Sequence, residues 1–302
     1  MTAPDVASVR VALVGYGEVG GILGAALVRR GVGAVHAYDV AMHDPARRAG
    51  MLERARTDRV RACDSSAAAV GDADLVISAV TASATRDAAD TAAQSMRPGA
   101  FFLDLNSASP GTKTGCGAVV DAAGAHYVEA AVMTSVPPYG IRVPMLIGGP
   151  HARALSPLLD ALGFAANVVS DALGVASAIK MCRSVVVKGM EALLVESFLT
   201  ARRYGVEDAV IASLAETFPG LDWERNGSYF WQRVIRHGRR RAEEMREAAV
   251  TVREAGVAPL MAAATAERQA WMAALAAEGV FAQAADDAPW RDYADRVARD
   301  AD

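Results

Sequence analysis

Short apolar runs recur through the first half of the chain, and segments with helical spacing of apolar residues lie between them. Runs of this kind, bounded by turn residues, are typical of buried β-strands. The predicted strands are Val9–Val14, Ala34–Tyr38, Leu75–Val80, Phe101–Asp104, Tyr127–Val132 and Met145–Gly148. The predicted helices between them are Gly21–Arg30, Ala84–Ser95 and Lys113–Ala123. Strands that alternate with helices at this spacing predict an α/β fold with a doubly wound parallel sheet.

Beyond these strands the pattern becomes helical. Ser170 is the expected N-cap of one long helix that runs to about Tyr204, because apolar residues recur there at helical spacing. The helices that follow are expected to break near Gly205, Pro219, Gly227, Gly256 and Pro259. We therefore expect an α/β domain over residues 1–168 and an all-helical domain over residues 169–302, with the long helix between the domains. The charged tail from Asp286 is expected to fray or to pack at the periphery.

A glycine motif, G-x-G-x-x-G, follows the first predicted strand. Its first glycine permits a tight turn, its second lets the backbone approach a pyrophosphate, and its third lets the next helix pack close to the strand. The residues of this predicted cofactor loop are Gly15, Tyr16, Gly17, Glu18, Val19 and Gly20. With the strand before it and the helix after it, the motif predicts a Rossmann domain, whose helix N-terminus binds phosphates. The alternative is a glycine-rich structural turn.

An acidic residue, Asp39, ends the second predicted strand, about 20 residues after the last glycine. A carboxylate at this place can accept hydrogen bonds from a ribose 2′-OH, and it repels a 2′-phosphate. NAD is therefore expected to be preferred over NADP. Arg47 and Arg48 lie just beyond and could offset the repulsion if the loop folds back.

Composition narrows the class of protein further. The chain has 302 residues and a net charge of -4, so no nucleic-acid partner is expected. No apolar run has transmembrane length, and the first residues lack the features of a signal peptide, so no membrane partner is expected. Cys63, Cys116 and Cys182 are few and have no metal-ligand spacing, so no metal is expected and the reducing cytoplasm is the expected compartment.

Three further segments carry a resemblance to a known family. They read Asp104-Leu-Asn106-Ser107-Ala-Ser109-Pro110, then Glu129-Ala-Ala-Val132-Met133-Thr134-Ser135, and then Gly174-Val-Ala-Ser-Ala-Ile-Lys180-Met-Cys182-Arg183-Ser184. In this order, after the glycine motif, they resemble the D-x-S-T-x-x-P, D-A-P-V-S-G-G and G-x-x-x-x-x-K-x-x-x-N elements of the β-hydroxyacid dehydrogenase superfamily. Its members include 3-hydroxyisobutyrate dehydrogenases and 6-phosphogluconate dehydrogenases. The resemblance covers nearly the whole chain.

Two departures from the family pattern separate this chain from the typical members. Met133-Thr134-Ser135 stands where the substrate loop has Ser-Gly-Gly, and Ser184 stands where the long helix has Asn. The segment from His237 to Met245 and the Lys188-Gly189 pair resemble a less studied branch, whose helical domain is like that of 6-phosphogluconate dehydrogenase. The substrate of the typical members is therefore not carried over.

The resemblance implies a role for each candidate site residue. Lys180, which lies in an otherwise apolar stretch of the long helix, is the expected proton-transfer residue. The residues expected near the cofactor after the strands are Val80, Thr81, Thr85 and Ser107. Those expected near a substrate are Thr134, Ser135, Ser184 and His237.

Each of these roles has a simpler structural alternative. Thr85 and Ser107 are good helix caps, and Ser184 could bond to its own helix backbone. His237 lies in a run of Arg and Glu that reads equally as a solvated, salt-bridged helix face. Lys188, two turns beyond Lys180, is expected to be a structural or interface charge rather than a second catalytic group.

The resemblance implies an NAD(P)-dependent oxidoreductase that acts on a β-hydroxy acid or a related polyol acid. In resembling enzymes a second subunit packs on the helical domain, so a homodimer is expected. An imine reductase shares this architecture, although its position matching Lys180 usually carries Asp or Tyr. An oxidoisomerase or a decarboxylating variant is a further alternative. The substituted substrate motifs also leave open a dinucleotide-binding protein without catalytic activity.

Overall fold

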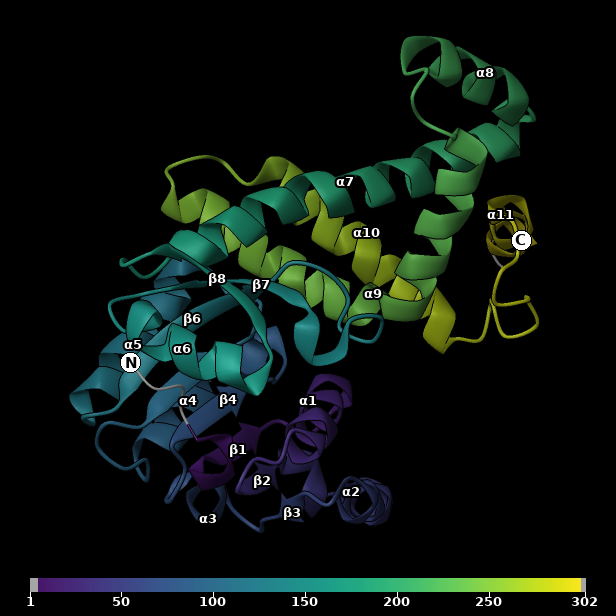
Figure 1. Cartoon of the computed structure of the whole chain (residues 1–302). Coiled ribbons are helices and arrows are strands. Elements are labelled where there is room, and N and C mark those ends of the chain that lie inside the picture. Colours follow the sequence, from purple (N-terminus) through teal and green to yellow (C-terminus); the bar gives the residue numbers. More distant parts are fainter. Residues whose placement is uncertain (1–4, 300–302) are drawn as a thin grey trace. The chain divides into compact units, whose positions relative to one another are not determined.

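The computed structural model describes residues 5–299, and the chain forms two compact units that divide between Met181 and Cys182 (Figure 1). The first unit contains the β-sheet, and the second is helical. The chain passes from the first unit to the second within α7 (Val175–Tyr204). The domain limits expected from the sequence, 1–168 and 169–302, stay a prediction.

Eight strands form one sheet in the order β3-β2-β1-β4-β5-β6-β7-β8. Their bounds are β1 (Arg10–Val14), β2 (Ala34–Tyr38), β3 (Arg61–Ala62), β4 (Leu75–Ser78), β5 (Phe101–Asp104), β6 (His126–Val132), β7 (Pro144–Gly148) and β8 (Ala165–Ser170). Neighbouring strands are parallel except for β6 and β7, which are antiparallel. A loop with one short 3₁₀ turn, Gly140–Arg142, connects these two, whereas parallel neighbours need a longer crossover. The predicted doubly wound parallel sheet is therefore confirmed, with this one antiparallel pair.

All six predicted strands are present. The two strands at the edges of the sheet, β3 and β8, were not predicted. β3 has two residues, and β8 contains no buried residue, so neither shows an apolar run. The predicted strand Leu75–Val80 ends earlier, at Ser78. The helices of the first unit are α1 (Glu18–Arg29), α2 (Pro45–Asp58), α3 (Ser66–Val70), α4 (Thr85–Ala93), α5 (Pro110–Ala122) and α6 (Ala152–Leu162).

Two apolar cores cover the two faces of the sheet. Val11 and Leu13 of β1 point into one core, together with residues of α1, α2 and α6. Ala12 and Val14 point into the other, together with residues of α3, α4 and α5. Because successive side chains of a strand point to opposite faces, β1 is buried on both sides, which explains its continuous apolar run. This is the doubly wound arrangement that the sequence predicts.

The helical unit packs around a third core that includes the fully buried rings of Trp231 and Trp290. Its other helices are α8 (Glu207–Thr217), α9 (Trp223–Glu254), α10 (Leu260–Ala277) and α11 (Trp290–Arg299). As far as Arg299, the charged tail packs rather than frays, since Tyr293 and Val297 of α11 are buried in this core. Among residues 5–299, no helix has both the length and the apolar character needed to span a membrane.

Two local predictions in the helical half are wrong. Ser170 ends β8 and accepts a hydrogen bond from the Ala172 N–H, so it does not cap α7. Gly227 lies inside α9 rather than at a helix break. A Cβ there would meet the Phe198 ring at 2.6 Å, so this glycine lets α9 approach α7 closely.

Candidate functional site

The three glycines of the loop between β1 and α1 have different physical roles. Gly15 has a φ of +95°, and a Cβ there would lie 2.4 Å from the Ala79 carbonyl oxygen. A Cβ on Gly20 would lie 2.1 Å from the Gly15 carbonyl oxygen. Around Gly17, the N-cap of α1, a Cβ would meet nothing within 4 Å. The fold therefore requires Gly15 and Gly20, whereas Gly17 leaves open space before a helix N-terminus, which fits a pyrophosphate.

Asp39 fastens the end of β2 to this glycine loop. Its Oδ2 accepts a hydrogen bond from the Tyr16 N–H at 2.7 Å, and its Oδ1 accepts one from the Ala41 N–H at 2.8 Å. Each carboxylate oxygen has a further lone pair. Asp39 can therefore hold the loop and still accept a hydrogen bond from a ribose hydroxyl.

The side chain of Tyr16 points into the protein rather than toward the open space at Gly17. It is fully buried, and its hydroxyl donates to Asp58 Oδ2 at 2.8 Å. Arg54 hydrogen-bonds the Tyr16 carbonyl, and its guanidinium lies over the Tyr16 ring. Burial and the Asp58 carboxylate raise the pKa of Tyr16 well above its usual value. Tyr16 can thus contribute only its backbone to a cofactor site, while Glu18 is exposed at the start of α1 and Val19 is half-buried.

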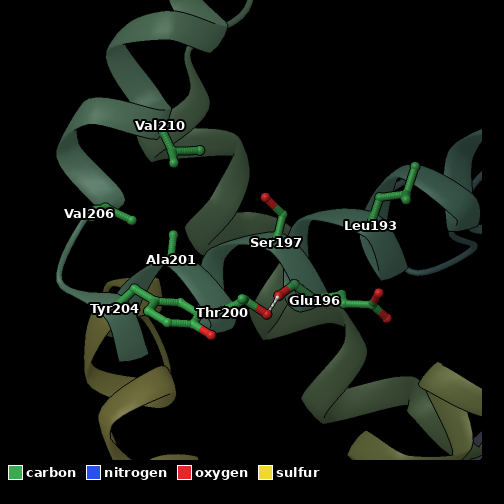
Figure 2. A pocket seen from close by; sticks show the side chains of 8 residues that line it. All are labelled: Leu193, Glu196, Ser197, Thr200, Ala201, Tyr204, Val206 and Val210. Atoms are coloured by element: carbon green, nitrogen blue, oxygen red, sulfur yellow. Dashed lines mark hydrogen bonds between the residues drawn. The ribbon is translucent and has the colours of Figure 1, made fainter.

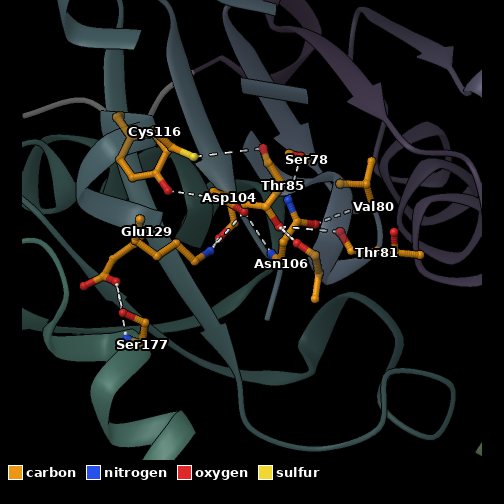
Figure 3. A network of polar contacts seen from close by, with 12 residues as sticks. Ser78, Val80, Thr81, Thr85, Asp104, Asn106, Cys116, Glu129 and Ser177 are labelled. Atoms are coloured by element: carbon orange, nitrogen blue, oxygen red, sulfur yellow. Dashed lines mark hydrogen bonds and ion pairs between the residues drawn. The ribbon is translucent and has the colours of Figure 1, made fainter. Parts of the chain in front are cut away.

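The ends of β4 and β5 are joined by Asn106 (Figure 3). Its Oδ1 accepts a hydrogen bond from the Val80 N–H at 2.7 Å, and its Nδ2 donates to the Ser78 hydroxyl at 2.9 Å. Its own N–H donates to Asp104 Oδ1 at 2.9 Å. Since Asn106 is almost fully buried, this network fixes the loop that carries Val80 and Thr81.

Beneath Asn106 lies a buried ion pair between Asp104 and Lys113, with 3.0 Å between Oδ1 and Nζ. Lys113 Nζ also donates to the Asp104 carbonyl at 2.9 Å, and the Tyr127 hydroxyl donates to Asp104 Oδ2 at 2.6 Å. Burial and the Asp104 charge raise the pKa of Tyr127. Burial also raises the pKa of the Cys116 thiol, on α5, to about 11. These groups form a buried, hydrogen-bonded support at the ends of β4 and β5.

The predicted cofactor residues after β4 and β5 differ in their surroundings. Thr81 is exposed, and its Oγ1 lies 3.2 Å from the Ser83 hydroxyl. Thr85 is buried, and its hydroxyl donates to the Ala82 carbonyl at 2.9 Å within its own turn. Ser107 is half-buried, and the cap of α5 is Ser109 instead, whose hydroxyl accepts from the Thr112 N–H. Thr81 and Ser107 therefore remain the more accessible candidates.

The start of α7 is attached to the sheet by Glu129 of β6. This carboxylate is fully buried, and it accepts hydrogen bonds from the Ala176 N–H at 3.0 Å and from the Ser177 hydroxyl at 2.8 Å. Lys180 is half-buried one helical turn beyond Ala176. Thr134 and Ser135, which follow the end of β6, are exposed.

In the helical unit, Ser184 and His237 differ in their exposure to solvent. Ser184 is buried, and its hydroxyl accepts a hydrogen bond from Lys188 Nζ at 3.5 Å. Lys188 is itself buried, with its Nζ 2.6 Å from Glu244 Oε2, and burial lowers its pKa. His237 is exposed on α9. This ion pair with Glu244 is consistent with the expectation that Lys188 is a structural charge.

Sequence reasoning missed the support that Lys113 and Asn106 provide, although the composition contains a usable signal. Only three of the 31 basic Lys and Arg residues are lysines, namely Lys113, Lys180 and Lys188. Two of these are buried, and the third is the proposed proton-transfer residue. Lysine can lose its proton and presents a compact ammonium group, neither of which arginine can do. In this arginine-rich chain, residue type alone therefore singles out the buried Lys113 and Lys188.

A surface groove of the second unit lies along the last turns of α7 and the start of α8 (Figure 2). It has a volume of about 380 Å³. Its lining residues are Leu193, Glu196, Ser197, Thr200, Ala201, Tyr204, Val206 and Val210. None of the predicted site residues is among them, so this groove is separate from the candidate site.

The fold and the glycine loop define an NAD(P)-binding protein of the Rossmann type. The NAD binding domain of 6-phosphogluconate dehydrogenase matches residues 10–170, which is more than half of the chain. Residues 201–272 match a Domain of unknown function (DUF1932). The chain therefore belongs to the family with the 6-phosphogluconate dehydrogenase NAD-binding domain, and the predicted family and branch are confirmed.

Solved structures agree with this assignment. A conserved hypothetical protein from Sinorhizobium meliloti 1021 is 36% identical, with a TM-score of 0.76 and 96% of each chain covered. The conserved protein MTH1747 of unknown function, described as similar to 3-hydroxyacid dehydrogenases, is 30% identical with a TM-score of 0.67, over 90% of this chain and 99% of that one. The 3-hydroxyisobutyrate dehydrogenase of Mycobacterium tuberculosis is 19% identical with a TM-score of 0.67, over 96% and 99% of the two chains, and shares the fold.

Proposed function

We propose that this protein is an NAD(P)-dependent oxidoreductase that transfers a hydride between a β-hydroxy acid, or a related polyol acid, and a nicotinamide cofactor. The observation that carries the proposal is the pairing of an open dinucleotide loop with a lysine placed near the same sheet. Gly17 leaves room at the N-terminus of α1, and the Asp39 carboxylate lies beside it. Lys180 follows the anchored first turn of α7 within the same compact unit.

Lys180 is the group that transfers the proton. When bound, a nicotinamide ring supplies the hydride chemistry. Lys180 takes the proton of the substrate hydroxyl in the oxidation and returns it in the reduction, which a lysine can do once its surroundings favour the neutral amine. Thr134, Ser135, Ser184 and His237 are the proposed contacts to the substrate, which we take to be a carboxylic acid. Decarboxylation or isomerisation of a β-keto acid product is a variant of the same reaction.

Asp39 is the proposed determinant of cofactor preference. Its carboxylate stands at the end of β2 with both oxygens hydrogen-bonded to backbone N–H groups, so its charge is held in place. A 2′-phosphate would meet this charge, and NAD is therefore preferred over NADP. Measured dissociation constants for NADH and NADPH test this preference, and tighter binding of NADPH would contradict it.

A homodimer is the proposed assembly. Within the described residues, α8 buries only Glu207, although it carries several apolar side chains. Val186, Leu193 and Tyr204 are exposed on α7. Ile211 and Leu214 of α8 are only partly buried against the third core. A helix as short as α8 is marginal in water without packing, so a second copy that covers its remaining apolar surface would stabilise it. Sedimentation at micromolar concentration is expected to show a dimer or larger species, and a stable single-chain species would contradict the proposal.

A substrate screen is the direct test of the reaction. Purified protein is incubated with a panel of β-hydroxy acids and polyol acids plus NAD or NADP, and formation of the reduced cofactor is followed by absorbance. A second panel pairs ketones and amines with the reduced cofactors, which detects an imine reductase. Turnover of hydroxy acids supports the proposal. Cofactor binding without turnover in either panel would instead favour a dinucleotide-binding protein without catalytic activity.

A further inference from the structure

The first turn of α7 lacks a cap from its own side chains. The Gly174 carbonyl accepts the hydrogen bond of the Ala178 N–H, so Gly174 is the N-cap residue. A glycine has no side chain that could bond the free N–H groups of the first turn, and Gly174 has a φ of +93°. The first four N–H groups of any helix have no partner within the helix. Because Ala176 and Ser177 are buried, acceptors for their N–H groups have to come from elsewhere in the chain.

Glu129, 47 residues away from Ala176 in the sequence, supplies them. Its Oε1 accepts from the Ala176 N–H at 3.0 Å, and its Oε2 accepts from the Ser177 N–H at 3.3 Å and the Ser177 hydroxyl at 2.8 Å (Figure 3). A carboxylate at a helix N-terminus is favoured by the helix dipole and by charge-assisted hydrogen bonds. These contacts account for a fully buried negative charge at this place.

The neighbouring strand leaves room for this carboxylate. Gly148 of β7 is the register partner of Glu129, and a Cβ on Gly148 would lie 2.7 Å from Glu129 Oε1. On its other side Glu129 pairs in register with Asp104, the last residue of β5. The carboxylate is thus held by the sheet at the level where β5 ends.

The anchored turn leads directly to Lys180. Ala176 and Lys180 are four residues apart, and Ser177 and Lys180 are three apart, so all three lie on one face of α7. A shift or rotation of the first turn would move the Lys180 amine by a similar amount. We propose that Glu129 is a positioning residue, which caps α7 from the sheet and thereby determines where Lys180 stands. This inference rests on the proposed function for its catalytic consequence, but not for the anchor itself.

The decisive variant is Glu129→Gln, which keeps the size of the side chain and removes its charge. An amide group would turn its NH₂ toward one of the N–H donors of α7, so the first turn loses part of its anchor. Turnover is expected to fall by about 100-fold, the loss that a displacement of about 1 Å can cause. The dissociation constant of the cofactor is expected to stay within about threefold, since the glycine loop is untouched.

Two readouts do not require turnover. The first is hydrogen exchange of the Ala176 and Ser177 amides, which Glu129 alone protects if the inference is right, and which Glu129→Gln is expected to accelerate at least tenfold. The second is acetylation of Lys180 followed by mass spectrometry as a function of pH. Its rate is expected to change at least threefold in the variant, while the buried Lys113 and Lys188 serve as internal controls.

Matched variants separate positioning from general damage. Ser177→Ala removes one of the three contacts and is expected to cost less than about threefold in turnover. Gly148→Ala leaves Glu129 in the chain but displaces its carboxylate, so it is expected to reproduce the effect of Glu129→Gln. Glu129→Asp keeps the charge at a shorter reach and is expected to lie between wild type and Glu129→Gln. Should Glu129→Gln fail to fold, Gly148→Ala and Glu129→Asp carry the same comparison.

Three results would overturn the inference. The first is rapid exchange of Ala176 and Ser177 in the wild-type protein. The second is unchanged Lys180 acetylation in variants whose exchange is accelerated. The third is wild-type turnover in such variants when Lys180→Ala itself has lost turnover. If instead Lys180→Ala keeps full turnover while exchange and acetylation respond as expected, the proposed function of Lys180 fails and the anchor stands.

Discussion

Buried charges are organised differently in the two units. In the sheet unit, Asp104, Lys113 and Glu129 are fully buried, and each is hydrogen-bonded to groups near the end of β5 or the start of α7. Parallel strands bring their ends to one edge of a sheet, so polar residues from distant segments meet there. The result is a compact support for the candidate site.

In the helical unit the buried charges are spread along helix faces. Arg241 of α9 and Gln269 of α10 hydrogen-bond Glu191 of α7. One turn earlier on α7, Lys188 pairs with Glu244 of α9. Glu191 Oε1 and Gln269 Oε1 have no hydrogen-bond partner among the described residues. These pairs hold helices together at several levels rather than building one site. The buried Lys113 of the sheet unit thus joins α5 to the end of β5, whereas the buried Lys188 of the helical unit joins α7 to α9.

The largest expected effect is that of Lys180→Ala. Loss of a positioned acid or base is expected to lower turnover by roughly 10²–10⁴, while the cofactor dissociation constant stays nearly unchanged. Steady-state kinetics on the substrate found by screening, together with fluorescence titration of NADH, measure both. Lys188→Ala, compared per folded molecule, is expected to lose far less turnover. The opposite order of the two variants would reverse the roles of the two lysines.

Lys188→Met tests the packing role. It leaves the Glu244 carboxylate without its buried cation, so the free energy of unfolding is expected to fall by about 3 kcal/mol. The double variant Lys188→Met with Glu244→Leu is expected to recover most of this loss, because it removes both charges. Arg268→Met is the control: its partner Glu196 is largely exposed, so the loss should stay below about 1 kcal/mol. Denaturant unfolding followed by tryptophan fluorescence measures all three, and equal losses in Lys188→Met and the double variant would contradict the buried-pair explanation.

Gly17→Ala tests whether the open space in the sheet unit belongs to the cofactor. A Cβ there meets nothing in the protein, so the melting temperature is expected to stay unchanged. The same Cβ would collide with a pyrophosphate, and the NADH dissociation constant is expected to rise at least tenfold, or about 1.4 kcal/mol. Gly50→Ala, at another glycine with open space, is the control and should bind NADH normally. Unchanged binding in Gly17→Ala would place the cofactor elsewhere.

The smallest effect concerns two stacked histidines, His126 and His151, whose ring centroids are 4.3 Å apart. Burial, and then the charge of His126, lower the pKa of His151, although Asp121 partly opposes this shift. The folded state therefore favours the neutral ring, so this contribution to stability is present above the unfolded pKa of about 6.5 and is lost as pH falls below it. Solvent screens the partly exposed ring, so the loss should stay below about 1 kcal/mol. His151→Phe keeps a ring in the stack and is expected to flatten the decline of stability between about pH 6.5 and pH 5, as measured by thermal unfolding. An unaltered pH dependence in this variant would assign the decline to other groups.

The sequence by itself determined the features that depend on short-range pattern. Continuous apolar runs identify the central strands, because a strand buried on both faces carries mostly apolar side chains. The spacing of Gly15, Gly17 and Gly20 identifies the cofactor loop, because the turn, the approach of a pyrophosphate and the packing of the next helix follow one another within six residues. The long helix up to Tyr204 follows equally from its periodicity.

Tertiary structure alone decided the features that depend on distant segments. No local pattern shows that Glu129 caps a helix 47 residues away, that β7 runs antiparallel to β6, or that Gly227 is a close contact rather than a helix end. Each of these features depends on which segment of the chain lies opposite a residue. That is decided only when the strands take their order in the sheet and the helices pack. Secondary structure is encoded locally, whereas buried polar partners and close contacts are set by packing between segments that the sequence keeps apart.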